Sequence, residues 1–106
     1  MTDVLKKEAL FLHYFVKLSN IEKRAIAKYM TKSQTTAISK IVYNAIKGSF
    51  SIDKSKLSEL KRYRTALYNI ADKKTSLKQK RNIISRRIGQ VTAILKEGLK
   101  WIPVKH

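Results

Sequence analysis

The stretch that decides the fold runs from Leu57 to Arg87 and reads LSELKRYRTALYNIADKKTSLKQKRNIISRR. Its first half carries apolar residues at spacings of three and four, the repeat of one buried helix face: Leu57, Leu60, Tyr63, Leu67 and Ile70. Its second half begins another such face: Leu77, Ile83, Ile84 and Ile88. The polar residues 72–76 between them predict a turn, with Thr75 or Ser76 available to cap the second helix. We therefore expect two packed helices joined by a short turn.

This stretch is also strongly basic. From Lys61 to Arg87 it holds ten Lys and Arg residues and one acid, Asp72. The whole chain of 106 residues has 24 Lys and Arg against 7 Asp and Glu, a net charge of +17. Because such self-repulsion is offset by a polyanion, we expect nucleic acid as the first partner and an anionic membrane surface as the second. The predicted nucleic-acid-binding residues are Lys61, Arg62, Arg64, Lys73, Lys74, Lys78, Lys80, Arg81, Arg86 and Arg87.

The rest of the chain predicts an all-α fold, because no segment alternates with a period of two for long enough to form a strand. We expect a single domain that forms a compact bundle of about five helices with short connections. Residues 1–48 supply mainly core helices, residues 53–88 the basic helix-turn-helix pair, and residues 89–106 an amphipathic C-terminal segment. The five expected helices begin near Thr2, at Ser19, at Ser33 or Thr35, at residues 51–53 and after Ser76, and the last bends near Gly89.

Several side chains have an expected place in the core. The middle of the first helix, residues 9–16, is apolar almost all round, which favours a central core helix over a dimer seam. His13 lies in that helix and is expected to be a hydrogen-bonded core residue. The second helix is expected to turn four residues inward, namely Ile21, Ala25, Ile26 and Met30. Trp101 is expected to cap the core.

Little in the sequence favours catalysis. The chain has no cysteine, its two histidines are His13 and His106, and its acids are scattered. It contains no paired metal-ligand motif, no glycine-rich phosphate loop and no nucleophile motif. We therefore expect neither catalytic residues nor a metal site nor a cofactor.

Binding of a polyanion is expected to be largely non-specific. A footprint of five to eight phosphates predicts a log–log salt slope of about −5 to −7. Base readout would need Arg, Asn or Gln aimed into a groove. Gln79, Asn82 and Gln90 are of the right type, but the sequence singles out none of them. The alternative to a binding surface is a charged face that is simply solvated.

Three segments carry a resemblance to a known family: NAIKG at 44–48, LKRYRTAL at 60–67 and IADKKTSLKQKR at 70–81. In this order they resemble small basic proteins of Polinton/Maverick-type elements and adintoviruses, which read N-x-L-K-G, L-K-x-Y/F-K-x-x-L-x-x-L-A and K-x-S-x-K-x-K-R. The resemblance covers residues 18–87. It implies a virion core component similar to adenovirus core protein X, located in the virion and the host nucleus or elsewhere inside the cell. It also implies a set of DNA-facing residues: Lys61, Arg62, Arg64, Lys73, Lys74, Lys78, Lys80 and Arg81.

The chain departs from that family after the basic helices. Where the family continues with a Q-x-G-G-F element and an apolar tail, this chain has Arg86-Arg87-Ile88-Gly89-Gln90-Val91 and a shorter amphipathic stretch. The resemblance therefore implies nothing about this tail. A copy of such a protein that serves a host would also fit.

Together these observations predict a non-enzymatic, viral or virus-derived protein that neutralises and condenses packaged double-stranded DNA. Self-association through the first helix or through residues 91–102 would let it bridge two duplexes. The alternative is a minor capsid or scaffold protein whose basic face binds an acidic protein or an anionic membrane. For the membrane, an interfacial helix would use Leu95, Leu99, Trp101 and Ile102.

Overall fold

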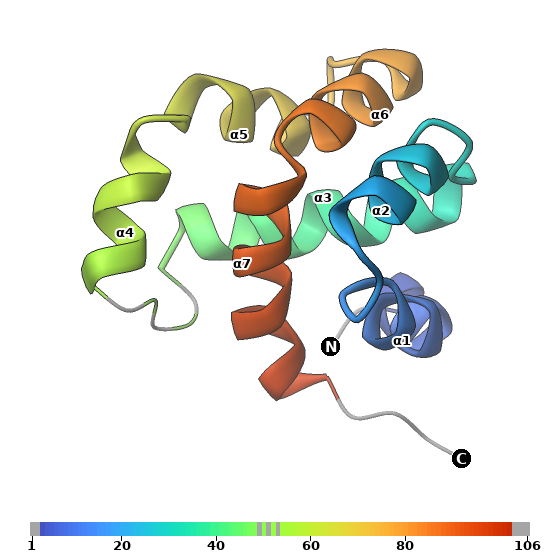
Figure 1. Ribbon diagram of the computed structural model, residues 1–106, viewed down its shortest axis with the longest axis horizontal. Coiled ribbons are helices and arrows are strands. Elements are labelled where there is room, and N and C mark those ends of the chain that lie inside the picture. Colours follow the sequence, from blue (N-terminus) through green and yellow to red (C-terminus); the bar gives the residue numbers. More distant parts are fainter. Residues whose placement is uncertain (1–2, 49, 51, 53, 103–106) are drawn as a thin grey trace.

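The computed structural model describes residues 3–48, 50, 52 and 54–102, and their regular secondary structure is all helical (Figure 1). They form seven α-helices and one 3₁₀ helix, so the predicted all-α class is confirmed, whereas the predicted number of about five helices is too low. The elements are α1 (Asp3–Phe15), α2 (Asn20–Ala27), α3 (Lys32–Ile46), α4 (Lys54–Lys61), α5 (Arg64–Ala71), α6 (Leu77–Arg86), α7 (Ile88–Gly98) and the 3₁₀ helix η1 (Leu99–Trp101).

The two additional helices arise from two breaks in the predicted long helices. Tyr63 separates α4 from α5 with φ −109° and ψ 22°, and Arg87 separates α6 from α7 with φ −109° and ψ 34°. Both conformations lie near the bridge region between helix and strand geometry. The break near Arg87 lies two residues before Gly89, where the bend was predicted. Each break turns the chain so that apolar residues on both sides of it reach the same core.

Three helices begin with a capping box, in which the N-cap residue and the residue three positions later bond to each other's backbone N–H: Ser19 with Glu22, Thr31 with Gln34, and Ser76 with Gln79. The predicted caps Ser19 and Ser76 are confirmed. The predicted start of the third helix at Ser33 or Thr35 is wrong, because Thr31 Oγ1 already accepts the backbone N–H of Gln34 at 3.1 Å. The caps predicted at Thr2 and at residues 51 and 53 lie outside the described residues.

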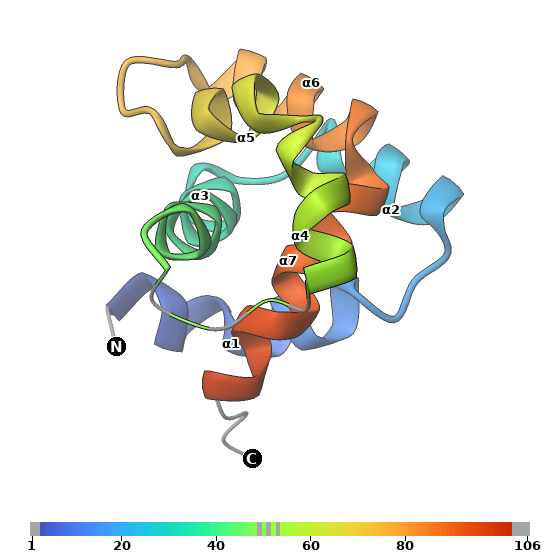
Figure 2. The same cartoon turned by 90° about the vertical axis from the view of Figure 1, so that its left-hand side faces the viewer.

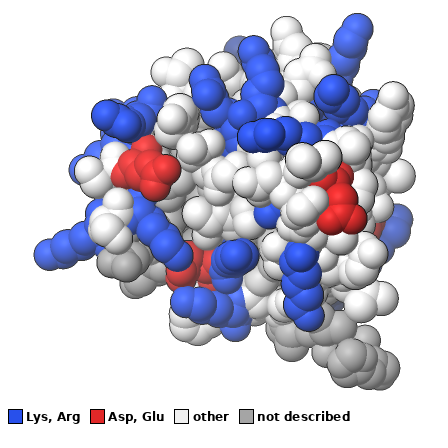
Figure 3. Space-filling model, in the orientation of Figure 1, with Lys and Arg blue, Asp and Glu red and all other residues white. Residues whose placement is uncertain are grey.

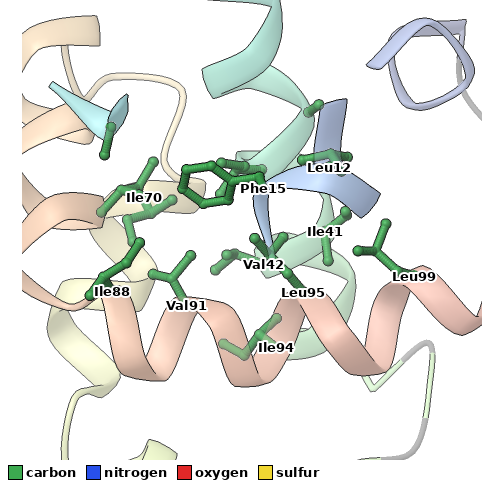
Figure 4. Close-up of a cluster of buried hydrophobic side chains, with 14 of the residues drawn as sticks. Leu12, Phe15, Ile41, Val42, Ile70, Ile88, Val91, Ile94, Leu95 and Leu99 are labelled. Carbon is green, nitrogen blue, oxygen red and sulfur yellow. The ribbon is translucent and has the colours of Figure 1, made fainter. Parts of the chain in front are cut away.

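The core is built around α3 and α7, which cross near the centre of the molecule (Figures 1 and 2). Figure 4 shows their side chains meeting those of α1 and α5, with Leu99 of η1 beside them. Ten of these buried residues are Leu12, Phe15, Ile41, Val42, Ile70, Ile88, Val91, Ile94, Leu95 and Leu99. The segment predicted as an amphipathic tail therefore contributes a central core helix. Most of its apolar residues between Val91 and Ile102 are buried in the core, and Trp101 is exposed.

The sequence predicts the buried residues of α1 better than those of α2. In α1, Leu12 and Phe15 are fully buried, while Leu10 and Tyr14 are exposed on the outer side. His13 is half-buried and its Nε2–H donates to the carbonyl of Ile102 at 2.6 Å, as expected for a hydrogen-bonded core histidine.

In α2 the predicted inward face is wrong for Ile21, which is 80% exposed, and for Ala25. The buried residues of this helix and its end are Lys23, Ala27 and Met30. The capping box at Ser19 fixes the phase of α2, and these three positions then face α6 and α7. The expectation that Trp101 caps the core is also wrong, because this side chain is 72% exposed.

Candidate nucleic-acid interface

The helices α5 and α6, with the turn 72–76 between them, form a hairpin that we call the basic hairpin. It lies along the upper edge of the molecule in both ribbon views (Figures 1 and 2). Its inward residues are buried against α2 and α3: Leu67, Ile70, Ile83 and Ile84. Because the apolar faces point inward, the remaining positions of both helices are turned to solvent.

Short-range hydrogen bonds define the turn of the hairpin. Asp72 ends α5, and its Oδ1 accepts the backbone N–H of Lys74 at 2.9 Å. The carbonyl of Asp72 accepts the N–H of Thr75 at 3.1 Å, and Ser76 then caps α6. This geometry leaves the exposed cations Lys73, Lys74 and Lys78 together at one end of the hairpin, a group that we call the turn cluster.

The other five exposed candidates gather at the opposite end, where the α4–α5 break meets the α6–α7 break. There the guanidinium carbon of Arg87 lies 4.7 Å from the ring centroid of Tyr63, a cation–π contact that ties the two breaks together. Tyr63, which the sequence places on the apolar series, is half-buried under this contact. We call the five cations the junction cluster: Lys61, Arg62, Arg64, Arg86 and Arg87.

Two of the ten predicted residues lie on the side of α6 that is partly covered by the rest of the protein. Lys80 and Arg81 are half-buried, whereas the other eight are exposed. Burial lowers the pKa of Lys80 from its ordinary value, and the negative charge of Asp72 opposes part of that effect. The Nε atom of Arg81 is buried without a hydrogen-bond partner among the described residues. These two side chains are less well placed than their neighbours to reach a ligand.

The basic hairpin has little negative charge to neutralise it. Between described residues, the ion pairs are Lys56 with Glu97 at 3.8 Å and Lys100 with Glu97 at 2.9 Å, and neither involves a predicted binding residue. Figure 3 shows the same excess of positive charge: Lys and Arg side chains lie over both the upper and the lower part of this face, and the acids are few and scattered. None of the eight exposed cations forms an ion pair with an acid in the described part of the chain.

One further arginine lies beside this surface, and no local pattern in the sequence points to it. The hydroxyl of Ser85, at the end of α6, donates to the carbonyl of Arg24 in α2 at 3.2 Å. This bond places the backbone of the exposed Arg24 beside Ser85, which directly precedes Arg86 of the junction cluster. The two residues are 61 positions apart in the chain, so only the packing of α2 on α6 brings them together.

Other kinds of site find less support in the described part of the chain. It contains no group of three or more potential metal-ligating side chains. None of its helices combines the length and the apolarity needed to cross a membrane. The proposed interfacial helix of the tail fails for a different reason: Leu95, Leu99 and Ile102 are buried in the core, and only Trp101 is exposed.

Chemically, the surface offers ammonium and guanidinium groups at two ends of a rigid hairpin. Both groups pair well with phosphate oxygens, and guanidinium does so in a bidentate manner. Comparison with known proteins adds no functional information. No protein-family model, curated protein or solved structure matches this chain.

Proposed function

We propose that this chain is a non-enzymatic protein that neutralises and compacts double-stranded DNA through the basic hairpin. The observation that carries the proposal is the gathering of eight exposed cations at the two ends of one hairpin, with no ion pair to a described acid. A phosphate backbone offers evenly spaced negative charges to such a surface. The more specific role of a virion core component rests on the family resemblance alone.

Compaction requires that one molecule contact two duplexes, and a second basic face supports this. The helix α1 lies on the opposite side of the molecule from the basic hairpin in both ribbon views. Its outer side and the residues that follow it carry three exposed lysines, Lys6, Lys7 and Lys17. A duplex on the hairpin and another on α1 would be bridged without any self-association of the protein.

The first test is duplex binding by fluorescence anisotropy across a salt series. The variant Lys73→Gln/Lys74→Gln/Lys78→Gln removes the turn cluster, and Lys6→Gln/Lys7→Gln/Lys17→Gln makes the same charge change on α1. We expect the wild-type log–log slope to be steep. It should become shallower by about two to three units in the turn-cluster variant, because each lost phosphate contact removes about 0.9 of a unit.

The α1 variant separates binding from compaction. We expect it to bind a short duplex with nearly the wild-type slope, but to need more protein to condense long DNA, measured by light scattering. Equal losses of slope in the two variants would contradict a localised binding surface. Weak binding by the wild-type protein would reject the DNA proposal and favour the alternative, an acidic protein partner of the basic face.

A further inference from the structure

The outward face of α6 carries a regular series of three exposed side chains, and one of them is uncharged. Lys78, Asn82 and Arg86 follow one another at intervals of four residues, and all three are exposed. Residues four apart lie on the same side of a helix, one turn above the other. The face therefore presents a neutral amide between two cations.

The structure also distinguishes among the three amide side chains of α6 and the start of α7. The side-chain oxygen of Gln79 folds back to accept the backbone N–H of Ser76 at 3.4 Å, as part of the capping box. Gln90 is half-buried in the first turn of α7. Asn82 is exposed in the middle of α6 and takes no part in the cap. Of the three, Asn82 is the one in a position to meet a ligand.

The major groove of B-form DNA can accept this face. The groove is about 12 Å wide and admits an α-helix that lies along it. From Lys78 to Arg86 the helix rises by about 12 Å along its own axis, at 1.5 Å per residue. With α6 lying along the groove, Asn82 faces the base pairs, and the long side chains of Lys78 and Arg86, one turn on either side of it, can turn toward the phosphates. An asparagine amide matches the N6 and N7 positions of adenine with two hydrogen bonds.

We propose that α6 enters the major groove of duplex DNA and that Asn82 gives the protein a preference for adenine at one position. This inference rests on the proposed function, since it assigns a reading residue to the DNA-binding surface. It goes beyond that function because charge neutralisation alone carries no sequence preference.

The test compares wild type with Asn82→Ala and uses Gln90→Ala as the matched control. Duplexes are first selected from a random library by the wild-type protein at a salt concentration that suppresses non-specific binding. Competition anisotropy then measures the preference for the selected duplex over one in which the adenine is replaced. We expect a preference of about 5- to 150-fold, the range given by one bidentate contact of about 1–3 kcal/mol.

Asn82→Ala should abolish this preference and leave the salt slope unchanged, whereas Gln90→Ala should keep both. Replacing the adenine by 7-deazaadenine, which lacks N7, should reduce the wild-type preference but not that of Asn82→Ala. Duplex binding without any selected sequence, or a preference that survives Asn82→Ala, would overturn the inference and leave the proposed function intact. Failure of the wild-type protein to bind any duplex would overturn both.

Discussion

At the residue scale, Gly98 determines how closely α7 approaches α3. A Cβ atom built on Gly98 would lie 2.6 Å from Cγ2 of Ile41, which is 1% exposed in the core. We predict that Gly98→Ala destabilises the protein by about 1–3 kcal/mol, because the extra methyl group overpacks the crossing of the two helices. Urea denaturation followed by circular dichroism would measure this loss.

Gly89 provides the control for this substitution because it lies in the same helix. Nothing lies within 4 Å of a Cβ atom built on Gly89, and the residue is exposed. Alanine is the better helix former, so Gly89→Ala should be neutral or stabilising by up to about 1 kcal/mol. If both substitutions changed stability by the same amount, the close approach at Gly98 would not be the cause.

Lys23 is a charged residue that is almost fully buried. It is 4% exposed on the inner side of α2 and has no ion pair with a described acid. Burial lowers its pKa from the ordinary value of 10.5, and the nearby charge of Lys96 lowers it further. We predict that Lys23→Met stabilises the protein at pH 7 by about 1 kcal/mol, since it keeps the long apolar stem and removes the charge.

The pH dependence of stability tests whether the buried charge of Lys23 is the cause of the gain expected for Lys23→Met. Just below pH 10.5 the unfolded chain holds more protons at Lys23 than the folded chain does, so raising the pH through this window favours the folded state. The advantage of Lys23→Met should therefore shrink between pH 7 and pH 10.5 in thermal melts. Lys28→Met, at an exposed position of the same segment, should change stability by less than about 0.5 kcal/mol. A destabilised Lys23→Met would show that the ammonium group makes a favourable contact.

At the element scale, the capping box of Ser76 holds the start of α6 and one side of the basic turn. Its Oγ accepts the backbone N–H of Gln79 at 3.2 Å. We predict that Ser76→Ala destabilises the protein by about 1 kcal/mol, the usual effect of losing an N-cap side chain. Ser58→Ala, at an exposed serine within α4, is the control and should stay within about 0.5 kcal/mol. Chemical denaturation would compare the two.

The same element shows what the sequence could predict. The turn 72–76 and the cap at Ser76 depend on neighbouring residues, so local patterns were sufficient to find them. The break at Tyr63 has no such local cause: Lys61-Arg62-Tyr63-Arg64 contains neither glycine nor proline, and Tyr63 makes no side-chain cap. The chain bends there because Leu60 and Leu67 are both buried in the core, which is a tertiary requirement.

The candidate site was predictable to a similar extent. The number and spacing of the charges located the basic hairpin and the helix breaks beside it, and eight of the ten predicted binding residues are exposed. The meeting of Arg87 with Tyr63 was not visible in the sequence, because it depends on the way two helix breaks come together. The place of Asn82 on the exposed face of α6 depends on the phase of this helix, which the cap at Ser76 and the burial of Ile83 and Ile84 determine jointly.

At the scale of the whole molecule, the dominant feature is the net charge of +17 on 106 residues. Seven acids cannot neutralise 24 cations, and the two ion pairs between described residues share one acid, Glu97. Repulsion between exposed cations therefore opposes the compact state, and salt screens it, with a Debye length of about 30 Å at 0.01 M and about 10 Å at 0.1 M.

We predict that the melting temperature rises with sodium chloride between 10 and 300 mM. For a domain of this size, each 1 kcal/mol of relieved repulsion corresponds to a rise of about 4–8 °C. The two triple glutamine variants, on the turn cluster and on α1, both reduce the charge from +17 to +14, so both should melt higher than wild type at low salt and depend less on salt. A melting temperature that falls with salt would mean that attractive pairs outweigh the repulsion. Similar melting of the two variants, combined with different duplex binding, would show that total charge governs stability while the placement of charge on the hairpin governs recognition.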